Sequence, residues 1–99
     1  MKNYLPIGSV VLLKEAEKRV MVVGLAQKEA ETEKIWDYSA VLYPEGMFDS
    51  NNLFLFNEDQ VESLFFIGFQ DAESLQFLKN LSESLNNSSE AKETPSAEV

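Results

Sequence analysis

The stretch at residues 9–26, SVVLLKEAEKRVMVVGLA, indicates how this fold begins. Two apolar runs, residues 9–14 and residues 19–26, flank the polar residues 15–18. Runs rich in Val and Leu on either side of a short polar turn are typical of a β-hairpin. Because both runs are apolar at consecutive positions, we expect strands that are covered on two faces or strongly curved. Gly24 interrupts the second run, which indicates a bulge or a close approach of two backbones.

The next segment with strand character is residues 35–43, IWDYSAVLY. Alternation along this segment places Trp36 and Tyr38 on one face and Tyr43 on the other. Pro44 follows, and proline cannot donate a hydrogen bond to a strand ladder. We therefore expect a third strand that ends in a turn.

The second half of the chain predicts two more strands and two helices. Residues 52–56 have the character of a short strand, and residues 64–69, LFFIGF, that of a strongly apolar one. Between them, Asn57 and Gln60 have the spacing of a capping box, which predicts a helix of one or two turns. Asp71 is a good N-cap for a second helix, which we expect to continue to about residue 86. The apolar stripe of this helix consists of Ala72, Leu75, Leu78, Leu81 and Leu85.

Together these elements predict an α+β fold that is mostly β: a small antiparallel curved sheet or barrel-like domain with a short helix and a C-terminal helix. A chain of 99 residues has room for one core, so we assign residues 1–86 to a single globular domain. Residues 87–99 contain almost no apolar side chains. We expect them to form a disordered acidic tail.

Acidic side chains dominate the charge of the chain. There are 17 Asp and Glu against 8 Lys and Arg, for a net charge of -9, and no Lys or Arg lies between Lys34 and Lys79. Such an interval repels nucleic acid and anionic membranes, so we expect neither as a partner. The acids either keep a small domain soluble or attract a basic partner, and both interpretations stay open. Because we find no signal peptide and no apolar stretch of about 18 residues, a cytoplasmic location is the simplest expectation.

The residue types on which most enzymes rely are missing. The chain has no Cys and no His, which excludes thiolate chemistry and the commonest general base. A Ser–Lys pair is the main remaining route to a nucleophile. Ser9 and Lys14 are close in sequence, but no nucleophile motif surrounds them. No glycine-rich phosphate loop is present. We therefore expect a protein that is not an enzyme and that uses no cofactor.

Two groups of residues with side-chain oxygens are candidates for binding a metal ion. Glu58, Asp59 and Glu62 fit on one helical turn, but adjacent acids at a helix start are typical of a solvated face. Residues 49–52, DSNN, contain oxygen ligands but lack the central glycine and the terminal glutamate of an EF-hand loop. We therefore predict no metal site.

A protein-binding surface is the function that the remaining residues favour. Aromatic and acidic residues cluster around the turn at residues 44–46, although these aromatics are equally good core residues and these acids equally good solvated ones. Residues 64–69, if exposed, form an interaction edge or an aggregation hazard. The stripe of the C-terminal helix either packs on the sheet or docks on a partner. The predicted partner contacts are Trp36, Tyr38, Tyr43, Glu45, Phe48 and Asp49.

Five segments occur in an order that is informative as a series. They are residues 5–14 (LPIGSVVLLK), 19–24 (RVMVVG), 36–46 (WDYSAVLYPEG), 56–59 (FNED) and 66–69 (FIGF). This series resembles a family of small Gram-positive bacterial proteins called domain of unknown function 4176. The resemblance covers roughly residues 5–69, and the order of the segments makes it more specific than any single one.

The resemblance implies an accessory role in type VII secretion, because the family tends to be encoded near type VII secretion genes and LXG-type toxins. The leading form of this role is a cytoplasmic chaperone or adaptor that binds a toxin before export. The alternative is an immunity protein that directly inhibits a toxin, since an acidic surface can complement a basic active site. The family supplies no catalytic residues, and the oligomeric state stays open.

Overall fold

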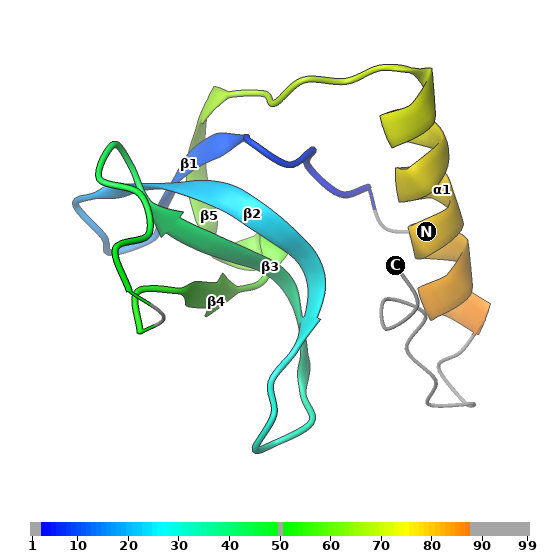
Figure 1. The fold of residues 1–99 in the computed structure, drawn as a ribbon, viewed down its shortest axis with the longest axis horizontal. Helices are drawn as coiled ribbons and strands as arrows, with labels where there is room; N and C mark the ends of the chain where they lie inside the picture. The colour runs from blue at the N-terminus through cyan, green and yellow to red at the C-terminus, as the bar shows by residue number, and fades with distance from the viewer. Residues whose placement is uncertain (1–2, 50, 88–99) are drawn as a thin grey trace. The chain divides into compact units, whose positions relative to one another are not determined.

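Residues 5–69 fold as a five-stranded antiparallel sheet (Figure 1) and form one of two compact units. A computed structural model describes residues 3–49 and 51–87; of these, residues 3–4 and 70–87 belong to the second unit. The strands are β1 (Val10–Leu13), β2 (Arg19–Lys28), β3 (Ile35–Leu42), β4 (Phe54–Phe56) and β5 (Val61–Phe66). Their order is β4-β3-β2-β1-β5, so β4 and β5 are the edges of an open sheet. The predicted α+β, mostly β fold with an antiparallel sheet is confirmed.

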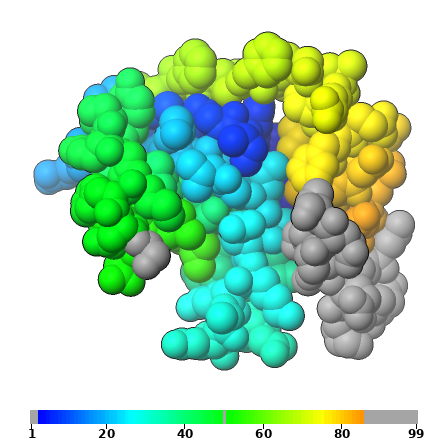
Figure 2. All heavy atoms as spheres, viewed as in Figure 1, coloured from blue at the N-terminus to red at the C-terminus, as the bar shows by residue number. Residues whose placement is uncertain are grey.

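Strands β1 and β2 form the predicted hairpin. Val11 pairs with Val20, and both side chains are buried. Strand β2 is two residues longer than predicted because Gln27 and Lys28 continue the ladder with β3. The tip of the β2–β3 hairpin projects beyond the neighbouring strands of the sheet, as the space-filling view shows (Figure 2).

Gly24 lies at the predicted irregularity of β2. The register between β2 and β3 shifts between Val22 and Gly24, which identifies a bulge. A Cβ atom at Gly24 would collide with the Ser39 hydroxyl and with the side chain of Gln27. Glycine at this position therefore avoids displacing the Ser39 side chain of β3 and the Gln27 side chain of β2.

The core of this unit is centred on Tyr38 of β3 and Phe56 of β4. Their rings stack with centroids 5.2 Å apart, and both are buried. Val22 and Ala40 are paired across β2 and β3 and are also fully buried. Burial of a large apolar side chain such as Phe56 stabilises the fold by about 1.5–3 kcal/mol.

The predicted short helix is a single 3-10 turn, Glu58–Gln60. The Gln60 side chain accepts the N–H of Asn57 at 2.8 Å, as the capping-box spacing predicted. The Asn57 side chain accepts the N–H of Asp37 on β3 at 3.0 Å. This turn is therefore fastened to the sheet as well as capped.

Strand β5 corrects the prediction for residues 64–69. The strand begins directly after the 3-10 turn, at Val61, and ends at Phe66. Beyond it, Gly68 passes so close to Ile7 that a Cβ atom would overlap the Ile7 carbonyl group. The Gly68 N–H donates to the buried Ser9 hydroxyl at 3.0 Å. Residues 67–69 therefore leave the ladder because a backbone crossing, with its own hydrogen bond, replaces strand pairing.

Helix α1 (Ala72–Asn87) belongs to the second unit and begins as predicted. Asp71 accepts the Ser74 N–H at 2.9 Å, and the Ser74 hydroxyl accepts the Asp71 N–H at 2.9 Å. This reciprocal pair is an N-terminal capping arrangement. No helix among the described residues is long and apolar enough to span a membrane. Apart from Asn87, which ends α1, the predicted tail at residues 87–99 lies outside the described residues.

Candidate functional site

One face of the sheet carries an apolar groove of about 400 Å³. Register explains why its side chains meet: Val10 of β1 is paired with Met21 of β2 and with Phe66 of β5. Paired residues of neighbouring strands point to the same face of a sheet. The groove therefore crosses three strands. It is lined by Gly8, Val10, Arg19, Met21, Tyr43, Phe65 and Phe66.

Among the described residues, Arg19 is the only charged one that lines this groove. Its guanidinium carbon lies 5.2 Å from the ring centroid of Tyr43 and 5.5 Å from that of Phe65. Both distances are within the range of cation–π attraction, about 6 Å. The Tyr43 N–H also donates to the Arg19 carbonyl at 2.9 Å, which fixes this pair of residues side by side. Arg19 is exposed and makes no ion pair with any residue that the structure describes, so its cation is open to a carboxylate of a partner.

The run from β5 onward is exposed. The sequence had left open whether residues 64–69 are exposed. Its large apolar side chains are between 45% and 80% exposed, and Glu62 is the only charged residue among residues 61–69. Strand β5 is an edge, so half of its backbone groups face away from β1. An apolar surface of this kind marks an interaction site or an aggregation hazard. The exposed side chains are Leu64, Phe65, Phe66, Ile67 and Phe69.

Four of the predicted contact residues lie in one segment after β3. Tyr43 lines the groove and Phe48 is exposed. Glu45 forms an ion pair with Lys18 at 2.8 Å, and this contact holds the pKa of the Glu45 carboxyl below its usual value. Asp49 accepts a backbone N–H within its own turn at 2.7 Å. The structure thus brings one of the four into the groove, and the contact role of all four stays a prediction.

Trp36 lies elsewhere, near the tip of the β2–β3 hairpin. Its indole N–H donates to Glu29 at 3.0 Å, and the ammonium of Lys34 lies 3.9 Å from the ring centroid. Tyr43 comes seven positions after Trp36 in the chain, which corresponds to about 23 Å along a strand. The structure therefore does not place Trp36 in a cluster around the turn at residues 44–46.

Tyr38 is a core residue, which is the other interpretation that the sequence allowed. Its ring is fully buried, and its hydroxyl accepts the Leu5 N–H at 2.9 Å and donates to Glu58 at 2.5 Å. Burial raises the pKa of the phenol above its usual value, and the hydrogen bond to Glu58 raises it further. In this conformation the Tyr38 side chain has no surface through which a partner could make contact.

Ser9 and Lys14, the pair considered for nucleophilic chemistry, both have structural roles. Ser9 is fully buried, and its hydroxyl accepts the Gly68 N–H. Lys14 is exposed, and its backbone N–H donates to the Gln60 carbonyl at 2.8 Å. Over residues 3–49 and 51–87, no three Asp or Glu side chains gather in a way that could hold a metal ion. Neither arrangement supports a reacting centre.

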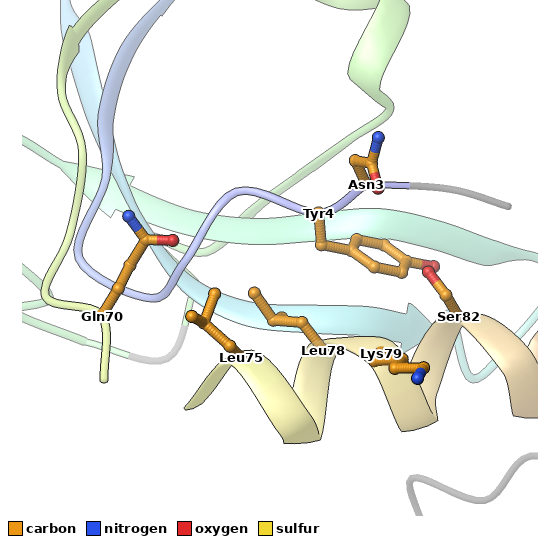
Figure 3. A pocket seen from close by; sticks show the side chains of 7 residues that line it. All are labelled: Asn3, Tyr4, Gln70, Leu75, Leu78, Lys79 and Ser82. Atoms are coloured by element: carbon orange, nitrogen blue, oxygen red, sulfur yellow. The ribbon is translucent and has the colours of Figure 1, made fainter. Parts of the chain in front are cut away.

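A second groove, of about 320 Å³, lies within the unit that contains α1. Figure 3 shows the Tyr4 ring beside the helix, with its hydroxyl toward Ser82. The Leu75 and Leu78 side chains extend from α1 on the same side. Because a larger share of its lining is polar, this groove is a weaker candidate for apolar recognition than the groove on the sheet. Its lining residues are Asn3, Tyr4, Gln70, Leu75, Leu78, Lys79 and Ser82.

The sequence-based site missed Arg19, Phe65 and Phe66. The apolar run at residues 64–69 was a usable signal, since it predicts an interaction edge if it is exposed. No local signal connects Arg19 with Phe65, because they are separated by three other elements of the chain and meet only through the pairing of β5 with β1.

The fold and the groove define a small, open-sheet α+β domain with an apolar groove on the sheet. A family model described as Domain of unknown function (DUF4176) matches residues 4–77, and the chain belongs to this family. The resemblance found in the sequence is thereby confirmed, and the match continues past residue 69 into α1. Comparison with curated proteins and with solved structures gave no match.

Proposed function

We propose that this chain is a non-enzymatic accessory factor that acts by binding another protein. The observation that carries the proposal is the exposed apolar run of β5 beside the groove on the sheet. Aromatic residues and Arg are enriched at protein interfaces, and this surface consists of Phe65, Phe66 and Tyr43 around Arg19. The net charge of -9 makes nucleic acid and anionic membranes poor alternatives.

The partner that we propose is a type VII-secreted toxin of the LXG type, bound in the cytoplasm before export. This part rests on the genomic surroundings typical of the family. Covering an apolar surface on both proteins would stabilise each of them by mass action until export begins. The role is then that of a chaperone or adaptor.

An immunity protein is the second candidate, and the charge distribution supports it. No Lys or Arg lies between Lys34 and Lys79, and an acidic surface can block a basic active site. The two roles differ in the part of the toxin that is bound.

Co-expression of the full chain with an LXG-type toxin encoded beside it tests the proposal. A complex with the export-targeting region supports a chaperone, whereas a complex with the toxic domain and loss of toxicity supports immunity. If neither part of the toxin co-purifies with the chain, both roles fail.

A matched pair of variants ties binding to the proposed surface. Phe65→Ser truncates an exposed ring of edge strand β5, and Phe54→Ser truncates an exposed ring of β4 at the opposite edge. We expect Phe65→Ser to weaken the complex about tenfold or more and Phe54→Ser to leave it nearly unchanged. Equal effects of the two variants would place the interface elsewhere.

A further inference from the structure

Strand β5 offers a backbone edge as well as apolar side chains. It is the last strand of the sheet, and its pairing with β1 uses only the backbone groups on one side. The groups on the other side have no ladder partner among the described residues. Proteins usually protect such edges with several charges, with proline or with a covering element. Residues 61–69 contain no proline and only Glu62 as a charged residue.

The groove beside this edge has the chemistry to hold side chains of an added strand. Phe65 and Phe66 lie on β5 itself, and Met21 and Val10 continue the apolar lining across the sheet. When a peptide adds to a sheet edge, backbone hydrogen bonds provide affinity and pockets for alternate side chains provide specificity. An edge and an adjoining apolar groove are both present here.

Arg19 adds an exposed cation to this surface. Its guanidinium lies within cation–π distance of the rings of Tyr43 and Phe65 and makes no ion pair with any described residue. A guanidinium in such surroundings is complementary to a carboxylate, which it can bind through two parallel hydrogen bonds. A partner segment that carries one acid among apolar side chains could pair with this exposed cation.

We propose that β5 and the groove bind an extended segment of a partner protein, which adds as a sixth strand and places a carboxylate against Arg19. This inference rests on the proposed protein-binding function and deepens it by naming the chemistry that is recognised. A second copy of the chain is the less favoured occupant, because each copy has a net charge of -9 and the two would repel each other.

The test uses the full chain and three synthetic peptides of nine residues with alternating Val and Thr. The first has Glu at the central position of the Val face, the second has Gln there, and the third has Pro in place of one central residue. Binding is measured by fluorescence anisotropy, and its location by amide chemical shifts. We expect the Glu peptide to bind about fivefold more tightly than the Gln peptide and to shift the amides of β5. We expect the Pro peptide to bind at least about tenfold more weakly, because it cannot complete the ladder.

Two variants of the chain identify the role of Arg19. Arg19→Gln should make the Glu and Gln peptides bind equally well. Lys28→Gln removes a cation at the far end of the same strand and should preserve the preference for Glu. No binding up to about 1 mM, an unchanged affinity for the Pro peptide, or a preference for Glu that survives Arg19→Gln would each overturn the proposal.

Self-association is measured in parallel by analytical ultracentrifugation. A dimer that Phe65→Ser abolishes would make a second copy the occupant and overturn the inference. If the toxin co-purifies with the chain but the peptides fail to bind, this inference falls and the proposed function stands. If the peptides bind but no toxin does, the named partner falls and the strand-binding site stands.

Discussion

The hydroxyl of Tyr38 donates a 2.5 Å hydrogen bond to the carboxylate of Glu58, and the same hydroxyl accepts the N–H of Leu5. One buried phenol thus connects β3, the 3-10 turn and the segment that leads into β1. These three parts are far apart in the sequence, with separations of 20 and 33 residues. The residue that the sequence offered as a partner contact is therefore a polar connection inside the sheet unit.

Tyr38→Phe should destabilise the fold by about 1–2 kcal/mol, because it removes the hydroxyl and leaves the partly buried Leu5 N–H without this acceptor. Tyr43→Phe is the matched control, since its hydroxyl makes no hydrogen bond with a described residue. We expect the control to change the free energy of unfolding by less than about 0.5 kcal/mol. Urea unfolding at neutral pH measures both, and an equal loss would contradict the role given to the Tyr38 hydroxyl.

Stability should fall with rising pH above about pH 10, where an ordinary phenol ionises. The folded state raises the pKa of Tyr38 through burial and the hydrogen bond to Glu58. Below that pH both states keep the proton and the stabilisation is complete. Above it the unfolded chain loses the proton first, so the free energy of unfolding decreases by up to about 1.4 kcal/mol per pH unit from this group. The difference in free energy of unfolding between the natural chain and Tyr38→Phe should therefore shrink between about pH 10 and pH 12. If the free energies of unfolding of the two proteins changed in parallel with pH, this linkage would be ruled out.

Gly68→Ala should cost more stability than Gly46→Ala, although both replace glycine outside a strand. At Gly68 a methyl group would meet the backbone of Ile7 and Gly8, which cannot move aside, so we expect a loss of about 2–3 kcal/mol. Gly46 has open space around it but a φ of +79°, which costs about 1 kcal/mol for alanine. Thermal unfolding of the two variants provides the comparison. The reverse order would show that the backbone crossing at Gly68 is easily displaced.

Ser74→Ala tests the start of α1. The Ser74 hydroxyl accepts the Asp71 N–H, and this pair begins the helix. We expect a loss of about 0.5–1 kcal/mol, seen as faster amide hydrogen exchange in the first turn of α1. Ser84→Ala, in the last turns of the same helix, is the control and should leave exchange in the first turn unchanged. Identical exchange in both variants would mean that this cap does not limit opening of the helix.

Local chemistry in the sequence predicts much of the sheet. The rest depends on pairing between distant residues and could not be predicted. The hairpin, the bulge at Gly24 and the turn at Asn57 each have a signal within a few residues. The limits of β5 have none, because the strand ends where Gly68 meets Ser9, 59 residues earlier in the chain. Alternation placed Tyr38 on one face of its strand but could not reveal that the adjacent Ser39 would be buried as well. The groove could not be predicted from the sequence for the same reason, since Arg19 meets its aromatic neighbours only after the strands have paired.

The exposed ring of Phe69 should affect self-association without affecting stability. This side chain is 80% exposed, so Phe69→Ser gives up little buried surface and should change the free energy of unfolding by less than about 0.5 kcal/mol. Removing it from the apolar run should lower aggregation of the isolated chain at high concentration, as light scattering can measure. Phe56→Ser is the opposite case, since this ring is 1% exposed and stacks on Tyr38; we expect it to destabilise the fold by about 3–5 kcal/mol. If Phe69→Ser destabilised the fold as strongly as Phe56→Ser, the run after β5 would be part of the core and not a surface for a partner.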